Sequence, residues 1–143
     1  MEKFTQFLIE STFETLLAMT SYISIMYFHE AGHYVASKLA GYNNIYFEYT
    51  KVFHVNVPCA VSGLKDDLFE SYKELRATFA LVGGILGGTF PIILYHFSPY
   101  SEPLFTLVLC IMYLRGCLTD LKMLFFILSG NYHKLDADNF TQL

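Results

Sequence analysis

The segment His29-Glu30-Ala31-Gly32-His33 has the residue types and spacing of a zinc-dependent hydrolytic site. On a helix, histidines four residues apart lie on one face, so both imidazoles can reach one metal ion. Zinc binds imidazole nitrogen readily, and three protein ligands leave a fourth position open for chemistry. Glu30 could take a proton from a zinc-activated water and pass it to a leaving amine. The motif therefore predicts one zinc ion, with Glu30 as the catalytic residue.

An alternative is that these polar residues form a buried hydrogen-bond cluster or a polar pair that holds helices together. The flanking sequence favours the metal site. No charged residue occurs between Thr15 and Phe28, and the apolar character resumes from Ala31 to Ala40. Ionisable groups at membrane depth cost free energy and usually serve a function.

The composition indicates that a membrane surrounds the elements that position this motif. Of the 143 residues, 15% are charged and 54% hydrophobic, whereas soluble domains have about 25% charged residues. A disordered chain, a coiled coil and a highly charged soluble surface are therefore disfavoured. The net charge of −4 and the absence of adjacent basic residues exclude nucleic acid as a partner. The three cysteines, which have no C-x-x-C spacing, predict neither a disulfide framework nor a thiolate zinc site.

Three apolar segments are long enough to cross a bilayer, at about 12–40, 76–98 and 104–129. The third carries Arg115 and Asp120, which must face protein or water. We therefore expect a single domain over residues 1–143, a mainly α membrane protein with three transmembrane helices. A polar tail covers residues 130–143.

The segment between the first two spans, at about 44–62, has a different pattern. Apolar and polar residues alternate from Ile45 to Val57, up to Pro58, which predicts a strand or an irregular hairpin. Basic residues are concentrated around this segment, at Lys38, Lys51, Lys65, Lys73 and Arg76. The positive-inside rule therefore predicts a multi-pass protein with this loop and the C-terminus in the cytoplasm, and the N-terminus outside.

The stretch from His29 to Ala36, followed by Lys38-Leu39-Ala40-Gly41, resembles the first core helix of the site-2 protease family of intramembrane zinc metalloproteases. That family has three core helices with a β segment after the first, and it cleaves transmembrane substrates within the bilayer. The segment 45–57 lies where the β segment would be, and 76–87 resembles the second helix. The resemblance implies a lipid bilayer and a transmembrane protein substrate as partners, with control by a regulatory membrane partner or a homo-oligomer.

The resemblance also implies a third metal ligand, because Asp120 falls where the family's third helix supplies a carboxylate. Asp120 is followed by Leu121 where the family usually has Gly, and no proline precedes it. Asp120 could instead pair with Arg115 or lie at the membrane interface near a helix end. Three residues of the polar tail are fallback ligands: His133, Asp136 and Asp138.

The glycines of the second span allow two interpretations. Gly83 and Gly87 satisfy a motif of the family's second helix, which implies a substrate-binding role. The chain has no Asn there to steady a substrate carbonyl, so the oxyanion-stabilising group is unassigned. Together with Gly84 and Gly88, these residues also form two overlapping small-x-x-x-small faces, which predict a close helix pair. The two roles are compatible.

His54, on the polar face of the alternating segment, is a candidate substrate-binding residue and could also approach the metal; otherwise it is a surface histidine. The sequence thus predicts an intramembrane zinc endopeptidase. The alternative from another class is a catalytically inactive membrane binding or scaffold protein that retains the fold. The presence of Glu30 argues against it, whereas the missing Asn and the altered surroundings of Asp120 argue for it. A zinc carrier would need further intramembrane ligands.

Overall fold

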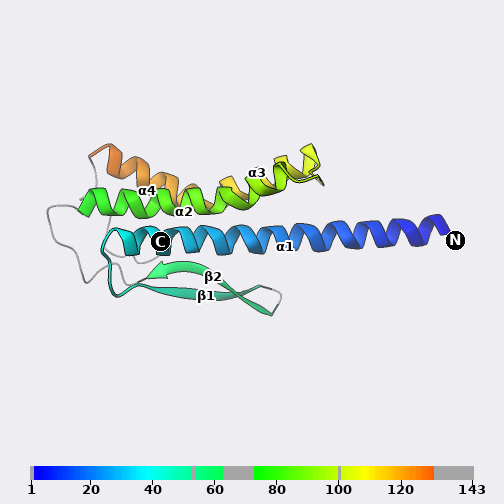
Figure 1. Cartoon of the computed structure of the whole chain (residues 1–143), viewed down its shortest axis with the longest axis horizontal. Helices are drawn as coiled ribbons and strands as arrows, with labels where there is room; N and C mark the ends of the chain where they lie inside the picture. The colour runs from blue at the N-terminus through cyan, green and yellow to red at the C-terminus, as the bar shows by residue number, and fades with distance from the viewer. Residues whose placement is uncertain (1, 53, 63–72, 100, 131–143) are drawn as a thin grey trace.

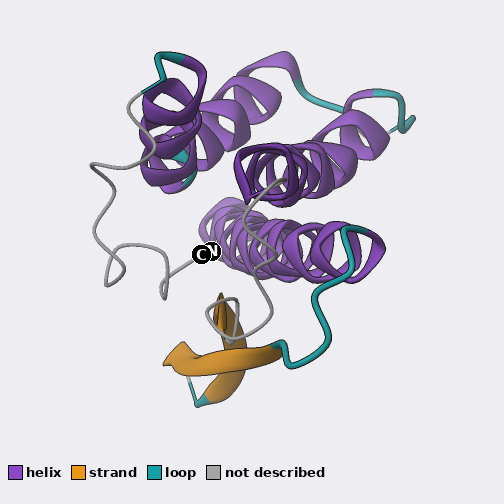
Figure 2. Cartoon of the chain, turned by 90° about the vertical axis from the view of Figure 1, so that its left-hand side faces the viewer, coloured by secondary structure: helices purple, strands orange, loops and turns teal. Residues whose placement is uncertain are grey.

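The computed structural model describes residues 2–52, 54–62, 73–99 and 101–130. The elements are α1 (Glu2–Leu39), β1 (Tyr46–Val52), β2 (Val55–Ser62), α2 (Lys73–His96), α3 (Pro103–Gly116) and α4 (Leu118–Leu128). The expected mainly helical fold with a short β segment is confirmed. Helix α1 runs the length of the molecule, with the β hairpin on one side and the other helices on the other (Figures 1 and 2).

Helices α1 and α2 pack closely because glycines face each other at the contact. A Cβ atom added at Gly32 would lie 2.1 Å from the carbonyl oxygen of Gly83, and one added at Gly87 would lie 2.2 Å from that of Phe28. Any larger side chain would push the two backbones apart, as the small-residue spacing predicts. The end of α1 is held to α2 by Arg76, whose Nε donates to the Ala40 carbonyl at 2.6 Å.

Two apolar clusters lie along this helix pair. One contains buried residues of α2, α4, β2 and the segment after α1: Tyr42, Ile45, Val61, Ala77, Leu81, Met123 and Ile127. The other joins α1, α2 and α3 through Ile25, Ile92, Leu109, Tyr113 and Cys117. Along α1, the residues His29 to His33 lie between the two clusters.

Among the described residues, one helix is long and apolar enough to cross a membrane. The span Glu74–His96 of α2 has a mean hydropathy of 1.9. Helices α3 and α4 are long and apolar enough to cross a membrane only when they are taken together, as a pair bent by 55°. Helix α1 is longer but does not meet it, since polar residues such as His29, Glu30 and His33 interrupt its apolar part. One or two candidate spans are therefore present where the sequence predicted three.

The third apolar segment is not the single helix expected over 104–129. It breaks after Gly116, where Cys117 has φ −90° and ψ 8° and its N–H donates to the Tyr113 carbonyl. Glycine favours such a break because it is a poor helix former, so no proline is required. The break makes Asp120 part of the first turn of α4.

The hairpin lies within the expected segment of about 44–62, and two of its features go beyond the alternating pattern. Val52 pairs with Val55, and His54 has a φ of 68°, a left-handed conformation that histidine tolerates better than most residues. The strand also continues past Pro58 to Ser62. Because Tyr49 pairs with Pro58 and Glu48 with Ala60, Cys59 is the extra residue of a β-bulge. The bulge accommodates the proline, which has no N–H for the ladder.

Candidate metal centre

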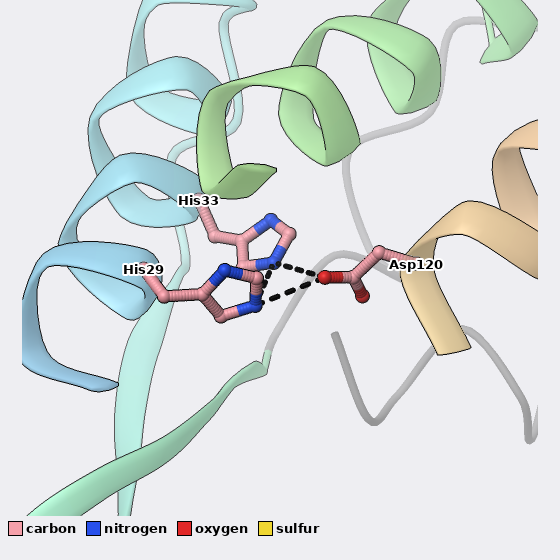
Figure 3. A group of neighbouring side chains, drawn as sticks. All are labelled: His29, His33 and Asp120. Carbon is pink, nitrogen blue, oxygen red and sulfur yellow. Dashed lines mark hydrogen bonds and ion pairs between the residues drawn. The ribbon is translucent and has the colours of Figure 1, made fainter. Parts of the chain in front are cut away.

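Side chains from α1 and α4 meet at one point (Figure 3). The Nε2 atoms of His29 and His33 lie 3.2 Å apart, and Asp120 Oδ2 lies 2.9 Å from the first and 3.3 Å from the second. His33 and Asp120 are buried, with exposed fractions of 1% and 6%. These three residues form a group that could hold a metal ion.

The hydrogen bonds of His33 show which of its ring nitrogens faces the group without a proton. Its Nδ1 lies 2.9 Å from the carbonyl oxygen of Ala80. A carbonyl only accepts, so Nδ1 carries the proton in the neutral ring and Nε2 presents a lone pair. That lone pair points toward the second imidazole and the carboxylate oxygen. A cation at this point would satisfy all three ligand atoms.

The spacing of the ligand atoms also fits a small tetrahedral metal. Zinc bonds to nitrogen and oxygen are about 2.0–2.2 Å long, which places two tetrahedral ligands about 3.3–3.6 Å apart. The observed separations of 2.9, 3.2 and 3.3 Å are close to this range. Two imidazoles and one carboxylate would leave a fourth tetrahedral position free.

A cavity of about 310 Å³ borders the ligand group. It is lined by His29, Glu30, His33, Glu48, Cys59, Ala60, Gly116, Thr119 and Asp120, which come from α1, the hairpin, the end of α3 and the first turn of α4. Glu30 is 6% exposed, and its Oε2 has no hydrogen-bond partner in the structure. A buried carboxylate oxygen without a partner is costly, and this one is available to a group bound in the cavity.

The glycines of the second span differ in what they face. Gly83 and Gly87 contact the backbone and Ala36 of α1 and do not line the cavity. Gly84 leaves space for the His33 ring, because a Cβ there would lie 2.2 Å from two ring atoms. The glycine-rich stretch thus provides both a close helix pair and room for a ligand.

Other candidate residues lie elsewhere. His54 is exposed at the hairpin turn and does not line the cavity. Among the residues that the structure describes, Asp120 contacts the two histidines, and no ion pair joins it to the exposed Arg115. The fallback ligands His133, Asp136 and Asp138 lie outside the described residues.

The sequence did not predict that Tyr113 and Cys59 lie near the candidate metal centre. Tyr113 packs edge-on against the His29 ring, at 5.8 Å between centroids. Nothing in the pattern distinguishes it from the other tyrosines of this aromatic-rich chain. Cys59 is directed to the cavity by the bulge, whose only signal was Pro58 within the alternating segment.

The Cys59 thiol is exposed, yet its pKa lies above the ordinary value of 9.0. Partial burial is the main cause, and the carboxylates of Glu30 and Glu48 raise the pKa further. A raised pKa lowers the thiolate fraction at neutral pH, so this cysteine is not an activated nucleophile. The cavity is therefore lined by acidic groups and a protonated thiol around the ligand group.

Comparison of the chain with protein-family models, curated proteins and solved structures gave no match.

Proposed function

We propose that this chain is an intramembrane zinc endopeptidase that hydrolyses peptide bonds of transmembrane protein substrates. Helix α1, helix α2 and the bent pair α3–α4 would be its three membrane segments, with the N-terminus outside and the C-terminus cytoplasmic. His29, His33 and Asp120 would hold the zinc ion. The bent third segment supports this arrangement, because its break lets a carboxylate face the other helices instead of lipid.

One observation carries the proposal: a group of ligand atoms and an unpartnered carboxylate share one cavity. The Nε2 atoms of the histidines and Asp120 Oδ2 are within 3.3 Å of one another. Glu30, one residue after the first histidine, is buried and lines the same cavity. A metal site alone would not require this glutamate, whereas hydrolysis requires a base beside the attacking water.

A bound zinc ion would supply Lewis-acid activation of water and of the scissile carbonyl. Glu30 would accept a proton from the water as its oxygen bonds to the carbonyl carbon. When the C–N bond breaks, the same carboxyl group would give that proton to the leaving nitrogen. The products are a carboxyl terminus and an amino terminus, and Glu30 returns to its starting protonation state.

The hairpin would present the substrate in an extended form. A helical peptide in lipid has its backbone groups bonded internally, so the scissile carbonyl must be unwound before attack. Glu48 and Ala60, which pair with each other across the hairpin, both line the cavity. An extended substrate beside this sheet would gain main-chain hydrogen bonds close to the metal ligands.

The test is cleavage of single-span substrates by the purified, detergent-solubilised protein, with zinc content measured in each sample. Glu30→Gln should retain one zinc per chain and lose cleavage by about 10²–10⁴-fold, because it removes the base and keeps the ligands. Glu102→Gln, at an exposed carboxylate away from the cavity, is the matched control and should cleave normally.

Equal cleavage by wild type and Glu30→Gln would overturn the proposal, as would the absence of zinc from the wild-type protein. Zinc binding without cleavage of any substrate would instead favour the inactive binding or scaffold protein.

A further inference from the structure

We propose that Tyr113 is a positioning residue that fixes the tautomer and orientation of His29, so that Nε2 of this histidine faces the metal. The inference rests on the proposed zinc site and assigns part of its support to α3. Tyr113 is buried, at 9% exposure. It lies seven residues before Asp120 on the other side of the helix break.

Three contacts of the Tyr113 side chain carry the inference. Its hydroxyl lies 2.6 Å from the carbonyl oxygen of Ile85 in α2. The same oxygen lies 3.4 Å from His29 Nδ1, slightly farther than in a usual N–H···O hydrogen bond. Its ring meets the His29 ring edge-on, with an interplanar angle of 74°. The tyrosine thus touches the side of His29 that faces away from the ligand group.

These hydrogen bonds favour a proton on Nδ1 of His29 once a cation occupies the ligand group. A tyrosine hydroxyl has a single proton, and the carbonyl of Ile85 can only accept it. Toward His29, the hydroxyl oxygen is therefore left as an acceptor. Nδ1 of His29 would then donate to it when a cation lies between Nε2 and Asp120 Oδ2, which are 2.9 Å apart. Nε2 would then be unprotonated and available as a ligand. Metal-binding histidines generally need such a partner on their second nitrogen.

Each of the two histidines would then be held by a hydrogen-bond connection from its Nδ1 to a backbone carbonyl of α2. His33 Nδ1 donates directly to the Ala80 carbonyl, at 2.9 Å. His29 reaches an α2 carbonyl through the Tyr113 hydroxyl. Space for the tyrosine ring is provided by Gly88, where a Cβ would lie 2.3 Å from a ring carbon. Gly84 and Gly88 thus make room for one ligand and for the support of the other.

The experiment compares zinc affinity of wild type, Tyr113→Phe and Tyr95→Phe, by competition with a chromophoric chelator in detergent. Tyr113→Phe keeps the ring and removes the hydroxyl, so zinc affinity should fall about 10-fold or more. Tyr95→Phe removes a hydroxyl that accepts from the Glu102 N–H and does not line the metal cavity, so its affinity should be unchanged. ¹⁵N spectra of the zinc-loaded, histidine-labelled protein should show His29 bound through Nε2 with Nδ1 protonated in wild type and Tyr95→Phe, and loss of this single form only in Tyr113→Phe.

A second variant separates positioning from simple presence of the hydroxyl. Gly88→Ala retains Tyr113 but displaces its ring, so it should weaken zinc binding as Tyr113→Phe does. If wild type binds zinc and Tyr113→Phe binds it equally tightly with an unchanged His29 tautomer, the inference is wrong and the zinc site stands. If wild type itself binds no zinc, the proposed function fails first.

Discussion

The two halves of α1 belong to one continuous helix but have opposite surroundings. In residues 2–24 the three phenylalanines are exposed, with Phe4 and Phe13 both at 66%. Hydroxyls in this half, such as that of Thr12, donate to the backbone of their own helix. In residues 25–39, Glu30, His33 and Ser37 are buried. Figure 1 shows the N-terminal half extending beyond the other helices.

The difference teaches that apolar composition alone does not locate a site in this chain. Both halves contain long apolar stretches with few charges. The hairpin and α4 meet the second half at the metal centre, whereas in the first half Thr20, Ser21 and Ser24 line a pocket with residues of α2 and α3. We call residues 2–24 the exposed half of α1 and residues 25–39 the buried half. A substitution should have very different effects in the two halves.

The largest effect is expected for Gly32→Val in the buried half. The new side chain would meet the Gly83 carbonyl, so α1 and α2 must separate and the ligands must move apart. We expect zinc binding to be lost and the protein to be destabilised by about 3 kcal/mol. Thr12→Val, in the exposed half, is the matched control for adding a β-branched apolar residue. Zinc content and thermal unfolding are measured for both variants. Normal zinc binding by Gly32→Val would show that the helices need not be so close.

A large effect on cleavage alone is expected for Val55→Pro, at the start of β2. Proline removes an N–H from the ladder and should disturb the hairpin that would pair with substrate. Val55 does not line the cavity, so zinc content should be unchanged. Val55→Thr keeps the N–H and the strand propensity and should cleave normally. Unchanged cleavage by the proline variant would remove the hairpin from the mechanism.

A moderate effect is expected on the reactivity of Cys59, which faces the buried half of α1. Its raised pKa means fewer thiolates at pH 8, so alkylation should be several-fold slower than for the same cysteine in the denatured chain. The rate should keep rising with pH beyond 9. A Cys110→Ser, Cys117→Ser variant leaves this thiol as the sole target for mass spectrometry. A rate equal to that of the denatured chain would show that the cavity does not shield it.

The smallest effect is expected for Phe7→Ser in the exposed half. The side chain is 61% exposed and contributes nothing to either apolar cluster. Zinc affinity and cleavage should match wild type, and stability in detergent should change by less than about 0.5 kcal/mol. A loss of zinc in this variant would mean that the two halves are coupled, which would contradict the comparison.

The parts of the site that follow local spacing could be predicted from sequence. Two histidines four apart share a helix face wherever a helix forms, and alternation predicts a strand wherever one face is buried. The pairing of Asp120 with them came only from the family resemblance, since it depends on how distant helices pack.

Local exceptions could not be predicted, because each depends on tertiary contacts that override propensity. The hairpin turns at His54 without a glycine, and the bulge allows Pro58 to lie inside a strand. The third segment breaks at Gly116 without a proline. Tyr113 has no signal in the sequence, because its role arises from a space at Gly88 on another helix.

The break between α3 and α4 makes the third ligand part of a short separate helix, 87 residues along the chain from His33. A metal bound by both would act as a cross-link that closes a long loop, and such cross-links stabilise mainly by restricting the unfolded chain. The metal would thus be a structural clamp for α4 as well as a centre of chemistry. Removing it should release the α4 end of the bundle before the α1–α2 pair, whose glycine contacts do not depend on any ion.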